Sequence, residues 1–101
     1  GHCGLLVQTV DGQPELEIGY SLLSEFWGKG YASEAATKCR DYAFHNDLSK
    51  SLISIISLSN IPSQKVALKN GMSNRKETKY KGNSVYIFRI DKSDWKRIFV
   101  V

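Results

Sequence analysis

Residues 26–34 read Phe-Trp-Gly-Lys-Gly-Tyr-Ala-Ser-Glu, and this stretch decides the fold. Gly28 and Gly30 flank Lys29, and an amphipathic helical pattern follows at once. A short glycine-rich turn that opens a helix gathers free backbone N–H groups and the positive end of the helix dipole at one point, where phosphate or pyrophosphate binds well. The glycines also allow a ligand to approach the backbone closely, because they carry no Cβ. A Gly-x-Gly by itself equally marks a plain tight turn, so its flanks decide between the two.

The segments on either side of this turn predict a strand, a helix and a second strand. Residues 15–23 alternate between apolar and other side chains with the period of two that is typical of a strand. Residues 31–45 place small apolar residues at steps of three and four, which marks one buried helical face. Residues 51–58 are apolar and β-branched on both parities, as in an interior strand covered on both faces. This order predicts a βαβ unit with the glycine-rich turn at the carboxyl end of its first strand.

The same signals predict the rest of a single α/β domain over residues 1–101. Its predicted fold class is a mixed twisted sheet with a central βαβ unit, a second short helix and a C-terminal hairpin. The further elements are a strand at 3–9 before the turn Asp11-Gly12, a helix at 62–70 stopped by Gly71, strands at 72–80 and 84–90 around Lys81-Gly82-Asn83, and a tail at 91–101 that adds a last turn or packing segment.

The composition is that of an ordinary globular protein. The chain has 101 residues, of which 42% are hydrophobic and 24% are charged. This length suits one modest core. We expect neither a disulfide scaffold nor a metal site, because Cys3 and Cys39 are isolated in the sequence. No apolar run approaches the roughly 18–20 residues of a membrane span. The expected compartment is a reducing cytoplasm.

The charge is distributed unevenly along the chain. Residues 1–48 carry three basic and seven acidic side chains, whereas residues 49–101 carry eleven basic and three acidic ones. A basic half can face nucleic acid or an anionic cofactor, or it can form a solvated surface, and we favour the last interpretation. A nucleic-acid-binding module over residues 75–97 stays a minor hypothesis, because the basic residues at 75–81 lack the interleaved aromatic residues of a stacking platform.

Two motifs in this order resemble the GNAT superfamily of acetyl-CoA-dependent N-acetyltransferases. One is EIGYSLL at residues 17–23, which leads into WGKGYASEA at 27–35, and the other is NIPSQKVALKNGM at 60–72. Their pairing at this spacing is far more specific than either motif alone. The subgroup that the chain resembles most is the ribosomal-protein N-terminal and polyamine acetyltransferase type. The resemblance implies an enzyme that moves acetyl from acetyl-CoA to a primary amine: a protein N-terminus, a polyamine or a small molecule.

The resemblance also implies roles for individual residues. Glu17 matches the position of a carboxylate base, and Ser63 is the expected proton donor, with Tyr80 as a second choice. The donor that many members carry as Tyr is replaced by Ala67, and Trp27 stands where Gln or Arg is usual. Coenzyme A is expected on the pantetheine-binding residues Leu22, Leu23 and Asn60, on Ser63, and on the pyrophosphate-binding turn Gly28, Lys29, Gly30, Tyr31 and Ala32.

The start of the chain departs from the family pattern. It opens with Gly1 and continues directly into a strand, whereas family members carry a strand, two helices and a further strand before this point. We therefore expect an N-terminally incomplete domain, with exposed sheet edges that a homodimer or strand exchange would cover. The alternative function is a non-catalytic remnant that binds coenzyme A or dimerises. The expected partner is the acceptor amine, with no nucleic acid and no membrane.

Overall fold

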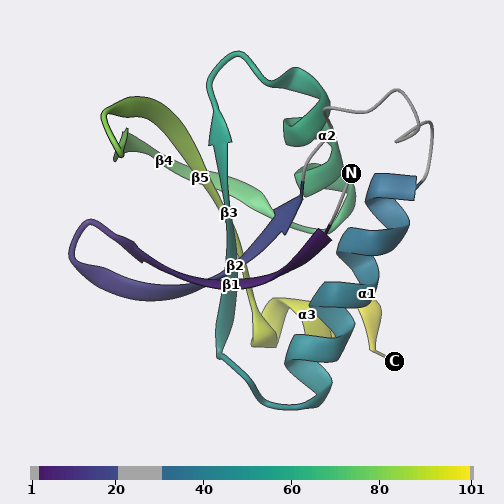
Figure 1. The fold of residues 1–101 in the computed structure, drawn as a ribbon. Coiled ribbons are helices and arrows are strands. Elements are labelled where there is room, and N and C mark those ends of the chain that lie inside the picture. Colours follow the sequence, from purple (N-terminus) through teal and green to yellow (C-terminus); the bar gives the residue numbers. More distant parts are fainter. Residues whose placement is uncertain (1–2, 21–30, 101) are drawn as a thin grey trace.

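In a computed structural model of the chain, five strands and three helices make up the described part of the fold (Figure 1). The structure describes residues 3–20 and 31–100. The elements are β1 (Cys3–Val10), β2 (Gln13–Tyr20), α1 (Tyr31–His45), β3 (Ser51–Ser57), α2 (Ile61–Lys69), β4 (Ser73–Tyr80), β5 (Asn83–Asp91) and α3 (Lys92–Phe99). The predicted fold class is confirmed. The tail, predicted as a last turn or packing segment, is the helix α3, and part of the predicted strand at 15–23 lies outside the described residues.

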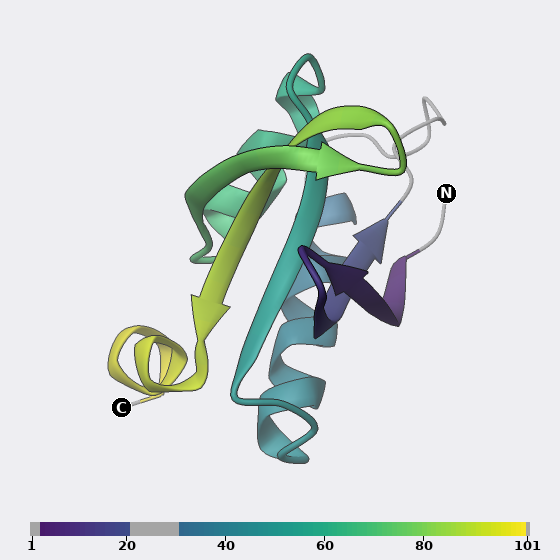
Figure 2. The same cartoon turned by 90° about the vertical axis from the view of Figure 1, so that its left-hand side faces the viewer.

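The strands form one mixed sheet in the order β1-β2-β3-β5-β4. β2 and β3 are parallel and are joined through α1, which is the predicted βαβ unit, whereas every other neighbouring pair is antiparallel. β3 therefore lies in the middle of the sheet, and Leu52, Ile53 and Ser54 are buried on both of its faces. Helices α1 and α2 cover one face, and α3 lies beyond the end of β5 (Figure 2).

The main core lies between the sheet and its helices. Ala36 and Ala43 are fully buried on α1, so that the helix backbone packs closely against the sheet. On α2, Val66 and Ala67 are buried in the same cluster. Trp95 attaches α3 to this core, because its ring contacts Phe44 at 5.3 Å between centroids. No helix in the described part of the chain is long and apolar enough to cross a membrane.

A polar network around the buried Arg40 joins α1 to the C-cap of α2 and to α3. Arg40 on α1 is 4% exposed and donates to both the backbone and side-chain oxygens of Asn70. Arg40 also donates to Asp41, which accepts a hydrogen bond from the indole of Trp95 at 2.9 Å. The guanidinium lies 3.8 Å from the centre of the Phe99 ring. Because each buried charge has a partner, the network stabilises the packing of α3.

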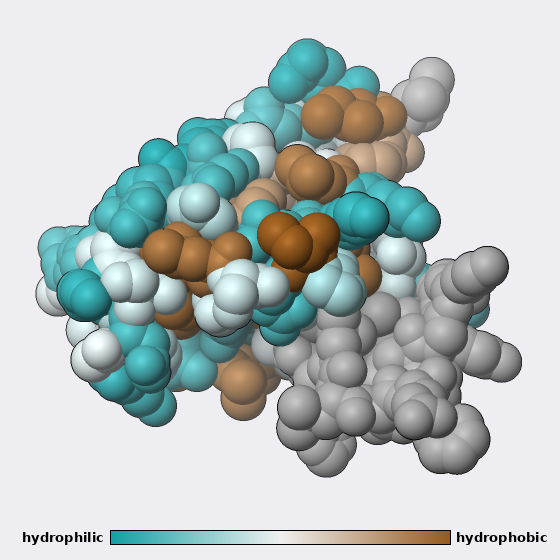
Figure 3. All heavy atoms as spheres, turned by 90° about the horizontal axis from the view of Figure 1, so that it is seen from above, coloured by the Kyte–Doolittle hydropathy of each residue, from teal (hydrophilic) through white to brown (hydrophobic). Residues whose placement is uncertain are grey.

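The opposite face of the sheet is covered by its own two hairpins. In a flat sheet, the edge strands β1 and β4 would lie about 19 Å apart across four strand spacings. The hydroxyl of Tyr80 on β4 nevertheless donates to Oε1 of Gln8 on β1 at 2.5 Å, and Lys76 contacts Asp11 at 2.5 Å. The sheet is therefore strongly curled. The curl buries a second apolar cluster, composed of Val10, Ile53, Val85 and Ile87. Hydrophilic residues predominate at the end of the molecule where the hairpin turns lie (Figure 3, left).

Candidate active site

The candidate site begins where β2 and β3 separate. The described register between them holds one pair, Glu17 with Ile53, whereas β1 and β2 pair along all eight residues. The two parallel strands diverge toward their carboxyl ends in both ribbon views (Figures 1 and 2). Backbone N–H and C=O groups at such an opening lose their ladder partners and need others.

Side chains supply those partners on both faces of the sheet. On the helix-covered face, the hydroxyl of Ser54 donates to the backbone oxygen of Ile18 at 2.9 Å, and Ser54 is 2% exposed. On the curled face, Oε2 of Glu17 accepts a hydrogen bond from the backbone N–H of Ile55 at 3.2 Å. The opening is therefore a stable feature of the sheet, because hydrogen bonds from side chains hold it at both faces.

Glu17 lies at one end of a chain of hydrogen bonds. Its side chain is mostly buried, and its Oε1 accepts from Nε2 of Gln8 at 3.1 Å. The Tyr80 hydroxyl donates to the other end of the Gln8 amide. A carboxylate has about four lone-pair positions on its two oxygens. The bonds from Gln8 and Ile55 orient the carboxylate and leave capacity to accept a proton.

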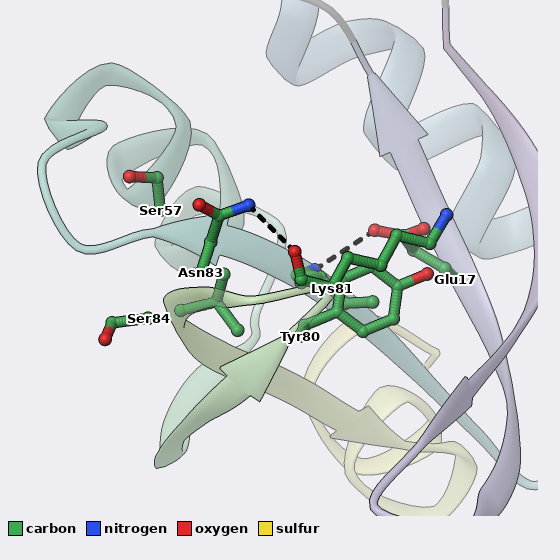
Figure 4. Close-up of a pocket in the computed structure, with 8 residues that line it drawn as sticks. Glu17, Ser57, Tyr80, Lys81, Asn83 and Ser84 are labelled. Carbon is green, nitrogen blue, oxygen red and sulfur yellow. Dashed lines mark hydrogen bonds between the residues drawn. The ribbon is translucent and has the colours of Figure 1, made fainter.

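A pocket of about 450 Å³ opens beside this carboxylate, between β3 and the β4–β5 hairpin (Figure 4). Both β2 and the hairpin contribute to its wall, because the sheet is curled. Its lining is mixed polar and apolar and consists of Glu17, Ile55, Ser57, Tyr80, Lys81, Asn83, Ser84 and Val85. The pocket can therefore bring a polar molecule to the Glu17 carboxylate.

Asn60 and Ser63 lie at the start of α2, which follows β3 in the chain. The side-chain oxygen of Asn60 accepts a hydrogen bond from the backbone N–H of Ser63 at 3.2 Å, so Asn60 is the helix N-cap. Ser63 is 5% exposed. Neither residue is part of the pocket lining around Glu17. Their roles toward coenzyme A and the leaving thiolate stay predictions.

The predicted pyrophosphate turn lies mostly outside the described residues. This holds for Gly28, Lys29 and Gly30 of the turn, and also for the predicted pantetheine-binding residues Leu22 and Leu23 before it. Of the remaining two residues, Tyr31 and Ala32, the structure gives the backbone, which forms the first turn of α1 as the sequence predicted. That turn lies at the same end of the molecule as the carboxyl end of β2 (Figure 1).

The sequence interpretation missed Gln8 and Ser54. The turn Asp11-Gly12 could have predicted where Gln8 lies relative to Glu17. Both of its residues have positive φ, and it pairs Val10 with Gln13. Counting from that turn places Gln8 opposite Glu15 and therefore diagonal to Glu17, within reach of a long side chain.

Comparison with known proteins decides the family. The sequence model described as "Acetyltransferase (GNAT) domain" matches residues 1–73 of this chain. The chain belongs to the GNAT acetyltransferase family. This confirms the family to which the two motifs pointed.

Two curated bacterial relatives of this GNAT chain match it only over part of their length. The chain is 40% identical over 72 residues to the uncharacterized protein YkkB of Bacillus subtilis, a match that covers 71% of this chain and 42% of the relative. It is 36% identical to the uncharacterized N-acetyltransferase p20 of Bacillus licheniformis, over 94% of this chain and 56% of the relative. The chain thus spans about half the length of these relatives.

Solved structures share the fold over a similar part. A ribosomal-protein-S5-alanine acetyltransferase from Vibrio fischeri matches with a TM-score of 0.70 and 25% identity, over 81% of this chain and 48% of the other. The aminoglycoside acetyltransferase AAC(6')-Ib in complex with coenzyme A matches with a TM-score of 0.75 and 14% identity, over 82% of this chain and 49% of the other. At that identity the second match shows the fold alone.

Proposed function

We propose that the chain is the coenzyme-binding part of an N-acetyltransferase that moves acetyl from acetyl-CoA to a primary amine. The observation that carries this proposal is the opening between β2 and β3 with a held carboxylate, Glu17, on its wall. The membership in the GNAT family supports it, as does the naming of an N-acetyltransferase among the relatives.

The opening fits an extended acyl carrier with amide groups. Beyond the Glu17–Ile53 pair, the described edges of β2 and β3 form no further register pair, so a ligand can hydrogen-bond there like an added strand. In this proposal Leu22, Leu23 and Asn60 hold the pantetheine arm. The backbone of Gly28, Gly30, Tyr31 and Ala32, together with Lys29 and Ser63, binds the remainder of coenzyme A, with the pyrophosphate at the start of α1.

The reaction needs one proton removed and one supplied. The amine nitrogen attacks the thioester carbonyl carbon, a C–N bond forms, the C–S bond breaks, and its electron pair leaves on sulfur. Glu17 accepts the proton that the amine nitrogen loses, and Ser63 gives its hydroxyl proton to the thiolate and is reprotonated from solvent. Each proton transfer of this kind contributes about 10²–10⁴-fold in rate. Tyr80 is the second candidate for the donor, and it lines the same pocket as Glu17.

Acetyl transfer by the Glu17→Gln variant tests the proposal. Gln keeps the size of the side chain but cannot accept the amine proton, so we expect kcat to fall at least about 100-fold while coenzyme A still raises the melting temperature. The rate is measured as thiol released and as acetylated amine by mass spectrometry, with peptides, a polyamine and small amines as acceptors. Glu77→Gln, on the exposed part of β4, is the control and should leave the rate unchanged.

Two outcomes would overturn parts of the proposal. Equal rates for the wild type and Glu17→Gln would show that Glu17 is not the base. A rise in melting temperature with coenzyme A, without turnover of any amine, would favour a non-catalytic coenzyme-binding protein.

A further inference from the structure

The β4–β5 turn places an unusual residue at the pocket. The turn consists of Lys81 and Gly82, between the paired residues Tyr80 and Asn83, and both have positive φ, 50° and 80°. Two-residue turns of this kind favour Asn, Asp or Gly at the first position, because other side chains strain the left-handed backbone. The β1–β2 turn has the same φ values and uses Asp11 there. Lysine at this position therefore makes the fold less stable than asparagine or aspartate would.

The two turn residues differ in what their charges do. Asp11 accepts hydrogen bonds from Lys76 and Thr78 and so links the two hairpins. Within residues 3–20 and 31–100, the Lys81 ammonium makes neither a hydrogen bond nor an ion pair, and it lies 5.3 Å from the centre of the Tyr80 ring. Figure 4 shows the Lys81 side chain reaching across Tyr80 toward the Glu17 end of the pocket. The charge is thus available to a molecule in the pocket.

The pocket wall carries both a negative and a positive side chain, and Lys81 reaches from the turn toward the end where Glu17 lies. Glu17 is the one carboxylate among the described lining residues. Lys81 lies at the turn, and the ammonium of Lys79 donates to the lining hydroxyl of Ser84 at 2.8 Å. A molecule with an amine at Glu17 would therefore place its next polar group near the Lys81 ammonium. A second ammonium there would be repelled, whereas a carboxylate would be attracted.

We infer that the acceptor is a primary amine that carries a carboxylate close to the amine, and that Lys81 selects for this carboxylate. This inference rests on the proposed acetyl transfer at Glu17. A free amino acid, through its α-carboxylate, and a peptide that begins with an acidic residue both carry this pair of groups. A polyamine does not, and on this inference it is a poor acceptor.

Matched acceptors test the inference on the full chain. Peptides that differ only in Asp or Asn at the first position, free glycine and glycinamide, and spermidine are compared by kcat/KM. We expect the member of each pair that carries the carboxylate to exceed the neutral one about tenfold, the worth of one charge-assisted hydrogen bond, and spermidine to be the poorest. Whether the peptide or the free amino acid shows the preference identifies the source of the carboxylate.

Variants of Lys81 assign the preference to that residue. Lys81→Asn removes the charge and suits the left-handed turn, so the protein should fold. The kcat/KM for the acidic acceptor should fall about tenfold, and that for the neutral acceptor should be unchanged. Lys81→Glu should reverse the preference. Lys96→Asn, on exposed α3, removes the same charge far from the pocket and should leave the preference intact.

A binding measurement separates this inference from the proposed function. The same peptides are titrated in the presence of coenzyme A, and the backbone amides of residues 80–83 are followed by NMR. The Asp peptide should bind about tenfold more tightly than the Asn peptide, and Lys81→Asn should abolish the difference. This result without any turnover would refute the acetyl transfer but keep the carboxylate site. Equal binding and equal turnover of the two peptides, or a preference that survives Lys81→Asn, would overturn the inference.

Discussion

The two edges of β2 are opposites. Toward β1 the strand pairs along its whole length, from Val10 with Gln13 to Cys3 with Tyr20. Toward β3 it forms one described pair and then separates. The same eight residues therefore build a closed edge and an open one, and the proposed base, Glu17, lies where the open one begins. A saturated ladder has no backbone group left for a ligand, whereas an interrupted ladder offers several.

The difference has a cause in the connections. A two-residue turn, Asp11-Gly12, fixes the register between β1 and β2 and forces them to pair from the turn onward. β2 and β3 are joined through the helix α1, which sets their direction but leaves their separation to side-chain packing. Hydrogen bonds of the Ser54 and Glu17 side chains then connect β2 and β3 where the strands separate.

Removing the Ser54 hydroxyl should produce the largest effect on stability at the open edge. Ser54→Ala leaves the carbonyl of Ile18 without its buried donor, so we expect the free energy of unfolding to fall by about 1–3 kcal/mol. The measurement is urea unfolding. Ser57→Ala, in the same strand but exposed, should change it by less than about 0.5 kcal/mol. Equal losses in the two variants would mean that the Ser54 hydroxyl does not hold the opening.

A substitution in the Asp11-Gly12 turn of the closed edge should change the free energy of unfolding only weakly. The hydrogen bonds that Lys76 and then Thr78 donate to Asp11 hold the pKa of that carboxyl below its ordinary value of 3.8. A lowered pKa in the folded state adds stability above the ordinary value, and this stability is lost as the pH falls through the folded value. We expect Asp11→Asn to unfold with a flatter dependence on acid pH than the wild type. The effect should be small and should shrink with salt, because the carboxylate is exposed.

Urea midpoints from about pH 7 to about pH 2 measure this difference. Parallel curves for the two proteins would show that the Asp11 contacts add nothing, and the curl of the sheet would then rest on its other contacts.

The sequence predicted the local elements well and the contacts between distant ones poorly. The spacing of alanines placed α1 over residues 31–45, and the Asp-Gly and Lys-Gly pairs placed both hairpin turns. α3 was underestimated, although Trp95, Ile98 and Phe99 have helical spacing. Alternation identified β2 as a strand with two unlike faces. It could not predict that Glu17 contacts Ile55, because that contact depends on how far β2 and β3 separate.

The hydrogen bond between Tyr80 and Gln8 could not be predicted from the sequence either. These residues lie on opposite edge strands, and they meet only because the sheet curls through its whole width. Curl of this kind arises from packing of both faces at once, so no local pattern encodes it. The residue roles toward coenzyme A came from the family resemblance rather than from residue spacing.

Titration with coenzyme A, followed at the backbone amides by NMR, tests most directly whether the open edge of β2 is the coenzyme site. The account predicts large shifts at Ile55 and at its neighbours on the open edge, with Leu6 and Val7 on β1 unchanged. Shifts confined to β1, or an Ile55 amide that stays unmoved at saturating coenzyme A, would contradict it.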